Sequence, residues 1–214
     1  SVPLKGFVPS KMGSNPKTGE AFDKEAYVKG AVTYDLSRAK KLLQKGYKQT
    51  GVNQLHVTLL TSDTDSSKDA AEFIQADLQK LPGVKIQVQS IPFVQLISKQ
   101  ADKDYQITVQ TWQSVFADPI NFLDVFEKGS SYNTSGYDSS KYDQLLDQSE
   151  NKFGNQPVKR WNNLVEAEKT LMNDQGTIPL YQVAKSQLLR TNVKNVVYNP
   201  AGVPYDWKTT YIAK

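Results

Sequence analysis

Three stretches in the first half of the chain carry the residue pattern of half-buried β-strands. In residues 55–60, apolar Leu55, Val57 and Leu59 lie on one face, and the polar residues between them lie on the other. Residues 84–91 repeat this alternation, and residues 105–112 form the third stretch. We therefore predict three strands in this half of the chain.

Apolar residues spaced three or four positions apart predict helices before and between these strands. The first covers about 35–46, with Asp35 as its N-cap and Gly46 at its end. The others cover about 67–81 and 92–100. The order helix, strand, helix, strand, helix, strand predicts an α/β layer in which helices cover a sheet.

The second half of the chain is more helical. A short apolar segment at 119–126 precedes a helix at 140–153, which we expect to begin with a capping box of Ser140 and Asp143. A longer helix follows at 157–173, with Pro157 in its first turn and Gly176 closing it. Short strands are predicted at 178–183 and 187–190, and residues 1–34 and the tail from Thr191 are expected to be irregular.

Composition narrows the possible functions. The chain contains 8 Phe, 3 Trp and 11 Tyr, too many aromatic residues for a disordered chain. Its net charge of +4 is spread over 26 basic and 22 acidic residues without a run of five like charges, so we expect no nucleic-acid partner. No apolar stretch approaches the roughly 20 residues that a membrane span requires.

Catalytic and cofactor motifs are scarce. Cysteine is absent, and His56 is the single histidine, so we expect no metal site and no cofactor. His56 falls on the polar face of a predicted strand, and the chain has no nucleophile elbow, Walker A or dinucleotide-binding motif. These observations favour a binding role over an enzymatic one. The 22 carboxylates nevertheless leave a carbohydrate-active hydrolase open as an alternative.

Four motifs between residues 105 and 143 resemble a known family. They are Tyr105 to Trp112, Asp118-Pro119-Ile-Asn-Phe122-Leu123, Asn133-Thr-Ser-Gly136-Tyr137, and Tyr142-Asp143. Supporting matches are Gly6-Phe7-Val8-Pro9, Tyr34-Asp35 with Ala39 to Leu43, and Ile178-Pro179-Leu180-Tyr181. In order and spacing, the set resembles the oligopeptide- and dipeptide-binding proteins that serve ABC importers, over nearly 180 residues.

The resemblance implies a fold and a division of the chain. The fold would be α/β, the second lobe of a type II, Venus-flytrap periplasmic-binding-protein-like fold, with a mixed sheet flanked by helices. Residues 1–190 would form this inserted second lobe, and residues 191–214 would be a tail that returns to a first lobe absent from this chain.

The resemblance also implies a function. The protein would be the extracytoplasmic substrate-binding component of a peptide ABC transporter and not an enzyme. It would capture an oligopeptide between two lobes by backbone hydrogen bonds and roomy pockets. Its partners would be the oligopeptide ligand, the first lobe and the transmembrane permease subunits. The full-length form would lie at the cell surface, anchored as a lipoprotein.

The candidate ligand-binding residues follow from the strand that ends at Trp112, because ligands of α/β layers lie at strand ends. Trp112, Gln113, Ser114, Val115 and Phe116 lie at this strand end, and Tyr132 and Asn133, from the motif that resembles the family, are further candidate lining residues. A core role for Trp112 and a loop-packing role for Tyr132 and Asn133 remain open. Val115 stands where many members of the family carry an acid that pairs with the peptide's amino end. Asp118, followed by Pro119, is interpreted as a helix N-cap.

Alternative functions remain within and outside the family. A receptor of the same fold for a sugar would use similar aromatic side chains. A sensor of signalling peptides without its own importer would have the same sequence features.

Overall fold

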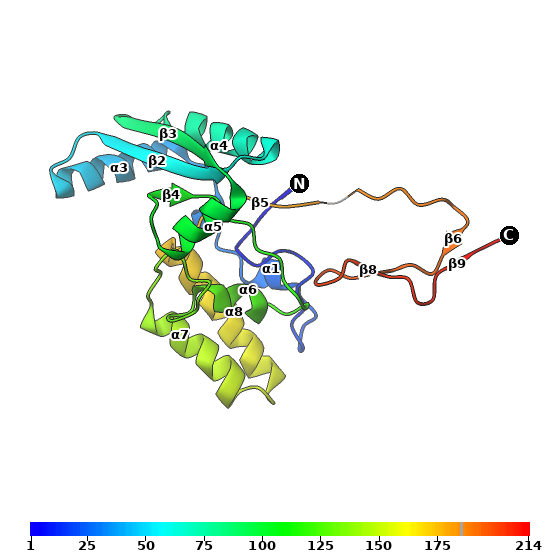
Figure 1. The fold of residues 1–214 in the computed structure, drawn as a ribbon. Helices are drawn as coiled ribbons and strands as arrows, with labels where there is room; N and C mark the ends of the chain where they lie inside the picture. Colours follow the sequence, from blue (N-terminus) through cyan, green and yellow to red (C-terminus); the bar gives the residue numbers. More distant parts are fainter. Residues whose placement is uncertain (185) are drawn as a thin grey trace. The chain divides into compact units, whose positions relative to one another are not determined.

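The computed structural model describes residues 1–184 and 186–214 (Figure 1). The chain divides into two compact units. One unit is Thr33–Thr111, and the other combines Ser1–Val32 with Trp112–Lys214.

The Thr33–Thr111 unit contains a three-stranded sheet. Its strand order is β3 (Val84–Ile91), β2 (Leu55–Ser62) and β4 (Ile107–Thr108). All three strands are parallel, because helices α4 (Asp65–Leu78) and α5 (Phe93–Ala101) carry the chain back between them. The predicted α/β fold is confirmed. This sheet is wholly parallel, and antiparallel pairing occurs only in the other unit among the described residues.

The first two predicted strands are confirmed and the third is much shorter than expected. In β3, Val84 and Ile86 are buried, whereas Lys85 and Gln87, which alternate with them, are exposed. The predicted strand 105–112 pairs only at Ile107 and Thr108, opposite Leu59 and Leu60 of β2. Just before it, the Gln106 side chain accepts a hydrogen bond from the Thr58 amide at 2.7 Å, so a side chain replaces the expected backbone pairing.

The first helix of this unit runs further than predicted. Helix α3 covers Leu36–Thr50, and Asp35 caps it by accepting a hydrogen bond from the Arg38 amide at 2.8 Å, as expected. It passes through Gly46 and ends at Gly51, whose φ of 72° supplies the left-handed C-cap. A glycine inside a helix costs only about 1 kcal/mol, so Gly46 does not end the helix.

The core of this unit lies between the sheet and its helices. Leu59 and Ala71 are completely buried there. Apolar side chains of α3 and α4 pack against them, among them Leu43, Ile74 and Leu78.

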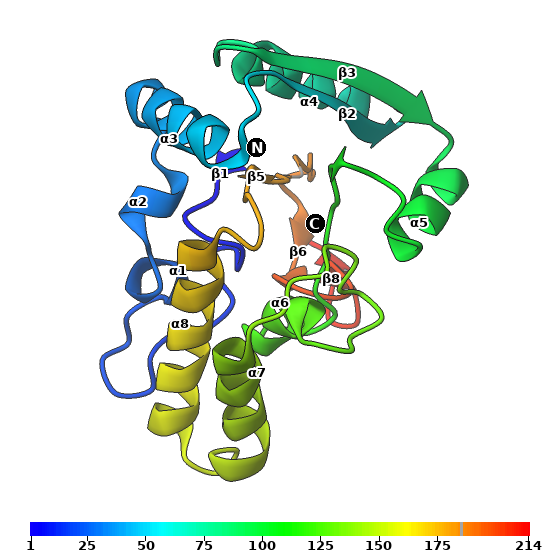
Figure 2. The same cartoon turned by 90° about the vertical axis from the view of Figure 1, so that its left-hand side faces the viewer.

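The other unit is mainly helical (Figure 2). Its elements are α1 (Phe22–Glu25), α2 (Lys29–Val32), α6 (Ile120–Leu123), a 3-10 turn (Asp124–Phe126), α7 (Ser140–Asp147), a π-helix (Gln148–Lys152) and α8 (Pro157–Asp174). The predicted helix 140–153 therefore consists of α7 and the π-helix, and Pro157 begins α8 as expected. The segment 1–34 is less irregular than predicted, since it includes two one-turn helices.

Two predicted helix ends differ in this unit. Ser140 and Asp143 form no capping box, because Asp143 instead accepts a hydrogen bond from the Lys128 amide at 3.0 Å. The left-handed residue that ends helix α8 is Gln175, with a φ of 55°, and not Gly176. A Cβ atom at Gly176 would lie 2.6 Å from Leu171, so this glycine is required by close packing.

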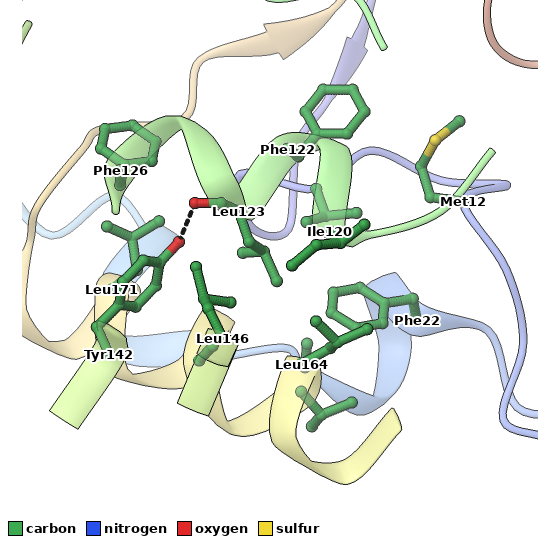
Figure 3. Packing of buried hydrophobic residues seen from close by; sticks show 14 of the residues in the cluster. Met12, Phe22, Ile120, Phe122, Leu123, Phe126, Tyr142, Leu146, Leu164 and Leu171 are labelled. Carbon is green, nitrogen blue, oxygen red and sulfur yellow. Dashed lines mark hydrogen bonds between the residues drawn. The ribbon is translucent and has the colours of Figure 1, made fainter. Parts of the chain in front are cut away.

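Figure 3 shows the core of the helical unit. Tyr142 is completely buried and its hydroxyl donates to the Leu123 carbonyl at 2.6 Å. The early segment of the chain enters the same core, where the Phe22 ring meets Trp161 edge-on at 5.2 Å. Helices α6, α7 and α8 are thereby joined to residues more than 100 positions earlier.

Short strand pairs complete this unit. β1 (Val2–Pro3) pairs antiparallel with β5 (Tyr181–Gln182), the only part of the predicted strand 178–183 that forms. Residues 186–192 are described and form no strand, so the predicted strand 187–190 is wrong. The tail is a hairpin instead of irregular chain: β6 (Val193–Lys194) pairs with β9 (Tyr211–Ile212), and β7 (Val197–Tyr198) with β8 (Tyr205–Asp206).

Among the residues that the structure describes, none of the helices combines the length and apolar character that a membrane crossing needs.

A buried carboxyl links the early segment to α8. Glu168 is 1% exposed, and its Oε1 accepts hydrogen bonds from the amides of Phe7 at 2.5 Å and Val8 at 3.4 Å. A Cβ atom at Gly6 would lie 2.1 Å from the same oxygen, so only glycine fits there. Burial raises the pKa of Glu168 to about 7, although the two amides oppose this shift.

We predict that Glu168 makes stability depend on pH. Its folded pKa of about 7 lies above the ordinary value of 4.5, so the folded state binds the proton more tightly than the unfolded state. The free energy of unfolding should therefore fall as pH rises from about 4.5 to 7, by about 3 kcal/mol at about 1.4 kcal/mol per pKa unit. Glu168→Gln should remove this contribution and leave a shallower slope in urea unfolding at a series of pH values, because burial also raises the pKa values of Asp124 and Glu127.

The matched control is Glu166→Gln, which removes a carboxyl that pairs with Lys141 at 2.7 Å on the exposed face of α8. This variant should keep the slope. Equal slopes for wild type and Glu168→Gln between pH 5 and 7 would contradict the prediction.

Candidate functional site

The loop that follows Trp112 carries most of the predicted site residues and is anchored by one side chain. The Oδ1 atom of Asn121 accepts hydrogen bonds from the Ser114 hydroxyl at 3.0 Å and from the Val115 amide at 2.8 Å. The Asn121 carbonyl accepts from the Trp112 indole nitrogen at 2.7 Å. A single residue of helix α6 thus holds Trp112, Ser114 and Val115.

Anchoring from α6 leaves the other side of the loop exposed. Ser114 is buried, and its hydroxyl also donates to the Phe116 carbonyl. By contrast, Val115 is 71% exposed and Phe116 is 48% exposed, and Gln113 is also exposed. The loop therefore presents two apolar side chains to solvent from a fixed backbone.

Trp112 and Tyr132 form an aromatic pair beside this loop. Their ring centroids are 4.9 Å apart at an interplanar angle of 66°. Trp112 is half-buried and packs against the core of the helical unit, while Tyr132 is 60% exposed. Trp112 thus combines the core contact that sequence left open with a contact to an exposed aromatic ring.

Asn133 is buried and holds a turn. Its amide nitrogen donates to the carbonyls of Phe126, Glu127 and Tyr137 at 3.1, 3.2 and 2.8 Å. Its Oδ1 accepts from the Gly136 amide at 3.0 Å and from the Ser135 hydroxyl at 3.1 Å. These contacts correspond to the loop-packing alternative, in which Asn133 shapes the backbone next to Tyr132.

The same turn is tied to the end of α8. The Tyr137 hydroxyl donates to Asp174 at 2.7 Å. Burial, followed by this hydrogen bond, raises the pKa of Tyr137 to about 12, so the hydroxyl stays protonated at neutral pH.

Asp118 closes the loop through an ion pair that sequence reasoning missed. Its Oδ1 accepts from the Ile120 amide at 2.9 Å, which is the predicted capping role, although α6 begins one residue later than expected. Both carboxylate oxygens also accept from the Arg160 guanidinium, at 2.8 and 3.0 Å. The negative charge of Asp118 is therefore matched within the protein.

Asn121 and Arg160 could not be identified from the sequence as supports of the site. Asn121 lies inside the Asp118-to-Leu123 motif, but a motif does not reveal which atoms its side chain contacts. Arg160 is 42 residues from Asp118 on α8. In the sequence, only the apolar residues of this helix indicated which way it faces.

His56 lies in the other unit, as an exposed residue on the polar face of β2. Lys85 and Gln87 of β3 line the same shallow hollow. This position agrees with the interpretation of His56 as a surface residue.

We predict that Asn121→Ala releases the loop. The Val115 amide would lose its acceptor and the Ser114 hydroxyl would keep only the Phe116 carbonyl, which should lower the free energy of unfolding by about 1–3 kcal/mol. Hydrogen exchange at the Val115 amide should accelerate by more than the global loss of stability explains. Asn151→Ala, which removes only an amide bond to Asp147 on an exposed helix face, is the control. Unchanged exchange at Val115 in Asn121→Ala would show that the loop is held in another way.

Comparison with known proteins adds a family and several relatives. The family described as "Bacterial extracellular solute-binding proteins, family 5 Middle" matches residues 1–134. The dipeptide-binding protein DppE of Bacillus subtilis (strain 168) is 32% identical over 78% of this chain and 30% of its own length. A dipeptide-binding protein of Lactococcus lactis is 29% identical over 99% of this chain and 38% of its own. This chain therefore spans about a third of the length of these curated relatives.

Solved structures agree in fold, which is that of type II periplasmic binding proteins. A peptide-binding protein of a peptide ABC transporter superposes with a TM-score of 0.80 at 35% identity, over 84% of this chain and 79% of that one. OppA of Listeria monocytogenes bound to peptide gives 0.81 at 31% identity, over 99% and 40%. The pheromone receptor PrgZ gives 0.82 at 34% identity, over 100% and 40%.

Proposed function

Since this chain belongs to the bacterial extracellular solute-binding proteins of family 5, we propose that it is part of the substrate-binding component of a peptide ABC importer. Its ligand would be an oligopeptide, and its further partners would be the permease subunits of the importer. The protein would act outside the cytoplasm, anchored at the cell surface as a lipoprotein in its full-length form. Relatives named as peptide-binding proteins support this assignment.

The observation that carries the proposal is the loop 112–116, whose backbone is held from one side while Val115 and Phe116 are exposed on the other. A peptide receptor must bind a common backbone and tolerate many side chains. A fixed loop offers backbone groups at constant positions, and exposed apolar side chains provide contact area without demanding one partner. Trp112, Gln113 and Tyr132 would complete this contact, with buried Ser114 holding the loop from inside and Asn133 shaping the turn that carries Tyr132.

We also propose the division of the chain into a second lobe, 1–190, and a tail, 191–214, that returns to a first lobe. The β1–β5 pair, which joins residues 2–3 to residues 181–182, supports this division because it brings the two ends of the lobe together. Highly exposed apolar side chains gather from residue 178 onward and would be covered by the first lobe: Ile178, Leu188, Val203 and Ile212, each at least 70% exposed.

A binding role without catalysis fits the chemistry of the loop. Asp118 is the carboxylate next to it in sequence, and its pairing with Arg160 leaves it poorly suited to act as an acid or a nucleophile. A sensor of signalling peptides is the second candidate, which the 34% identity to a pheromone receptor favours.

The test of peptide binding is Phe116→Ala in the full-length protein. This substitution removes an exposed ring from the proposed contact and should weaken oligopeptide binding about five- to tenfold in calorimetry, or about 1.4 kcal/mol at the upper limit. Phe73→Ala is the matched control, because Phe73 is 71% exposed on α4 in the other unit. Equal affinities of the two variants would remove the loop from the binding site.

A second expectation concerns the amino end of the peptide. Val115 carries no charge, and the charge of Asp118 is matched by Arg160, so this loop should not hold the peptide's ammonium group by a salt bridge. Free and N-acetylated forms of one peptide should bind the full-length protein with affinities within tenfold, about 1.4 kcal/mol. A larger loss on acetylation would contradict the expectation.

A further inference from the structure

The turn of the tail hairpin is closed by its own hydrogen bonds. The Asn199 amide donates to the Pro204 carbonyl at 3.0 Å, and the Asn199 side chain donates to the Val203 carbonyl at 3.0 Å. The segment Asn199-Pro-Ala-Gly-Val-Pro204 also contains two prolines, which limit its backbone freedom. It therefore forms a hydrogen-bonded turn between β7 and β8 (Figure 1).

This turn touches the loop that holds the candidate site. The Gly202 amide donates to the Ser114 carbonyl at 2.9 Å, and Ala201 packs against the same core cluster as Trp112. In both Figure 1 and Figure 2, the β8 end of the hairpin lies beside the segment that leads into α6. About 90 residues of chain separate the two contacting segments.

Gly202 is the residue that permits this approach. Its φ of +67° lies in the left-handed region, and a Cβ atom there would be 2.6 Å from the Val115 carbonyl oxygen. Backbone atoms of two segments meet at this point, so the contact cannot be relieved by a flexible side chain. Any residue with a Cβ atom would have to push the hairpin and the loop apart.

Two elements, α6 and the tail turn, thus hold the loop by hydrogen bonds. Asn121 of α6 holds the Val115 amide, and Gly202 of the tail holds the Ser114 carbonyl. Both anchors act on the single peptide unit that joins Ser114 to Val115, and the side chains of Val115 and Phe116, which follow this unit, are exposed. We infer that the tail turn, through Gly202, is a positioning element for the ligand loop and sets the affinity for peptide; this inference rests on the proposed function.

Gly202→Ala in the full-length protein tests the inference, with Gly19→Ala as the matched control. Gly19 also has a left-handed φ, +76°, but no atom lies within 4 Å of its Cβ position. Both variants meet the same backbone strain, whereas only Gly202→Ala disturbs the loop. Calorimetry at a temperature where circular dichroism shows full folding should give at least a tenfold higher Kd for Gly202→Ala and a change below twofold for Gly19→Ala.

A double-mutant cycle with Phe116→Ala separates positioning from a general structural effect. If Gly202 acts through the loop, Gly202→Ala should raise the Kd less than threefold once Phe116 is already alanine. If Gly202→Ala fails to fold, Asn199→Ala replaces it, because that substitution loosens the turn without placing an atom against Val115. Asn199→Ala is then expected to raise the Kd about three- to fivefold.

The outcomes distinguish the inference from the function on which it rests. A wild-type protein that binds no oligopeptide overturns both. A wild type that binds, together with a Gly202→Ala variant that matches Gly19→Ala in affinity, overturns the positioning role alone. Full additivity of Gly202→Ala and Phe116→Ala would also overturn it, since the two residues would then act independently.

Discussion

The junction between the first 30 residues and helix α8 is the constraint on which the helical unit depends. Phe22 packs edge-on against Trp161. The buried carboxyl of Glu168 accepts hydrogen bonds from two backbone amides of the early segment. Helix α8 also provides Arg160 to Asp118 and its last residue, Asp174, to Tyr137. One helix therefore carries contacts to the early segment, to the site loop and to the turn that bears Tyr132. Disturbing this helix would affect all three.

In the candidate site, the residues that hold the backbone are different from the residues that are exposed. Asn121, Asn133 and Asp118 use their polar atoms inside the protein, and the residues beside them remain exposed. Buried polar groups that are fully paired fix a backbone in one arrangement. Exposed apolar groups on such a backbone can then meet varied ligands at little entropic cost. This arrangement explains why apolar Val115 is compatible with a binding loop.

The sequence predicted the elements better than it predicted their ends and contacts. Alternation identified β2 and β3, although burial alternates only in β3, because β2 is the central strand and its last four residues are buried on both faces. Helical spacing identified α4 and α8. Gly176 misled because close packing, and not a helix end, requires glycine there, and Gly46 misled because a helix tolerates an interior glycine at a cost of about 1 kcal/mol. The tail hairpin was missed because its strands are two residues long and mostly exposed, so no apolar alternation marks them. Arg160 and Gly202 act through contacts between distant segments, which one sequence does not reveal, and Asn121 acts through side-chain contacts to a neighbouring loop, which a motif does not reveal.

The contact between Gly6 and Glu168 limits which substitutions these two positions can accept during evolution. A side chain at position 6 would occupy the space of the Glu168 carboxylate, so neither site can change alone without loss. A larger residue at position 6 becomes acceptable only when position 168 has already become smaller, and the two amides of residues 7 and 8 then need another acceptor. A substitution at position 168 must therefore come before a substitution at position 6. Members of the family with a side chain at position 6 should therefore also lack glutamate at position 168, whereas members without that glutamate can keep glycine at position 6.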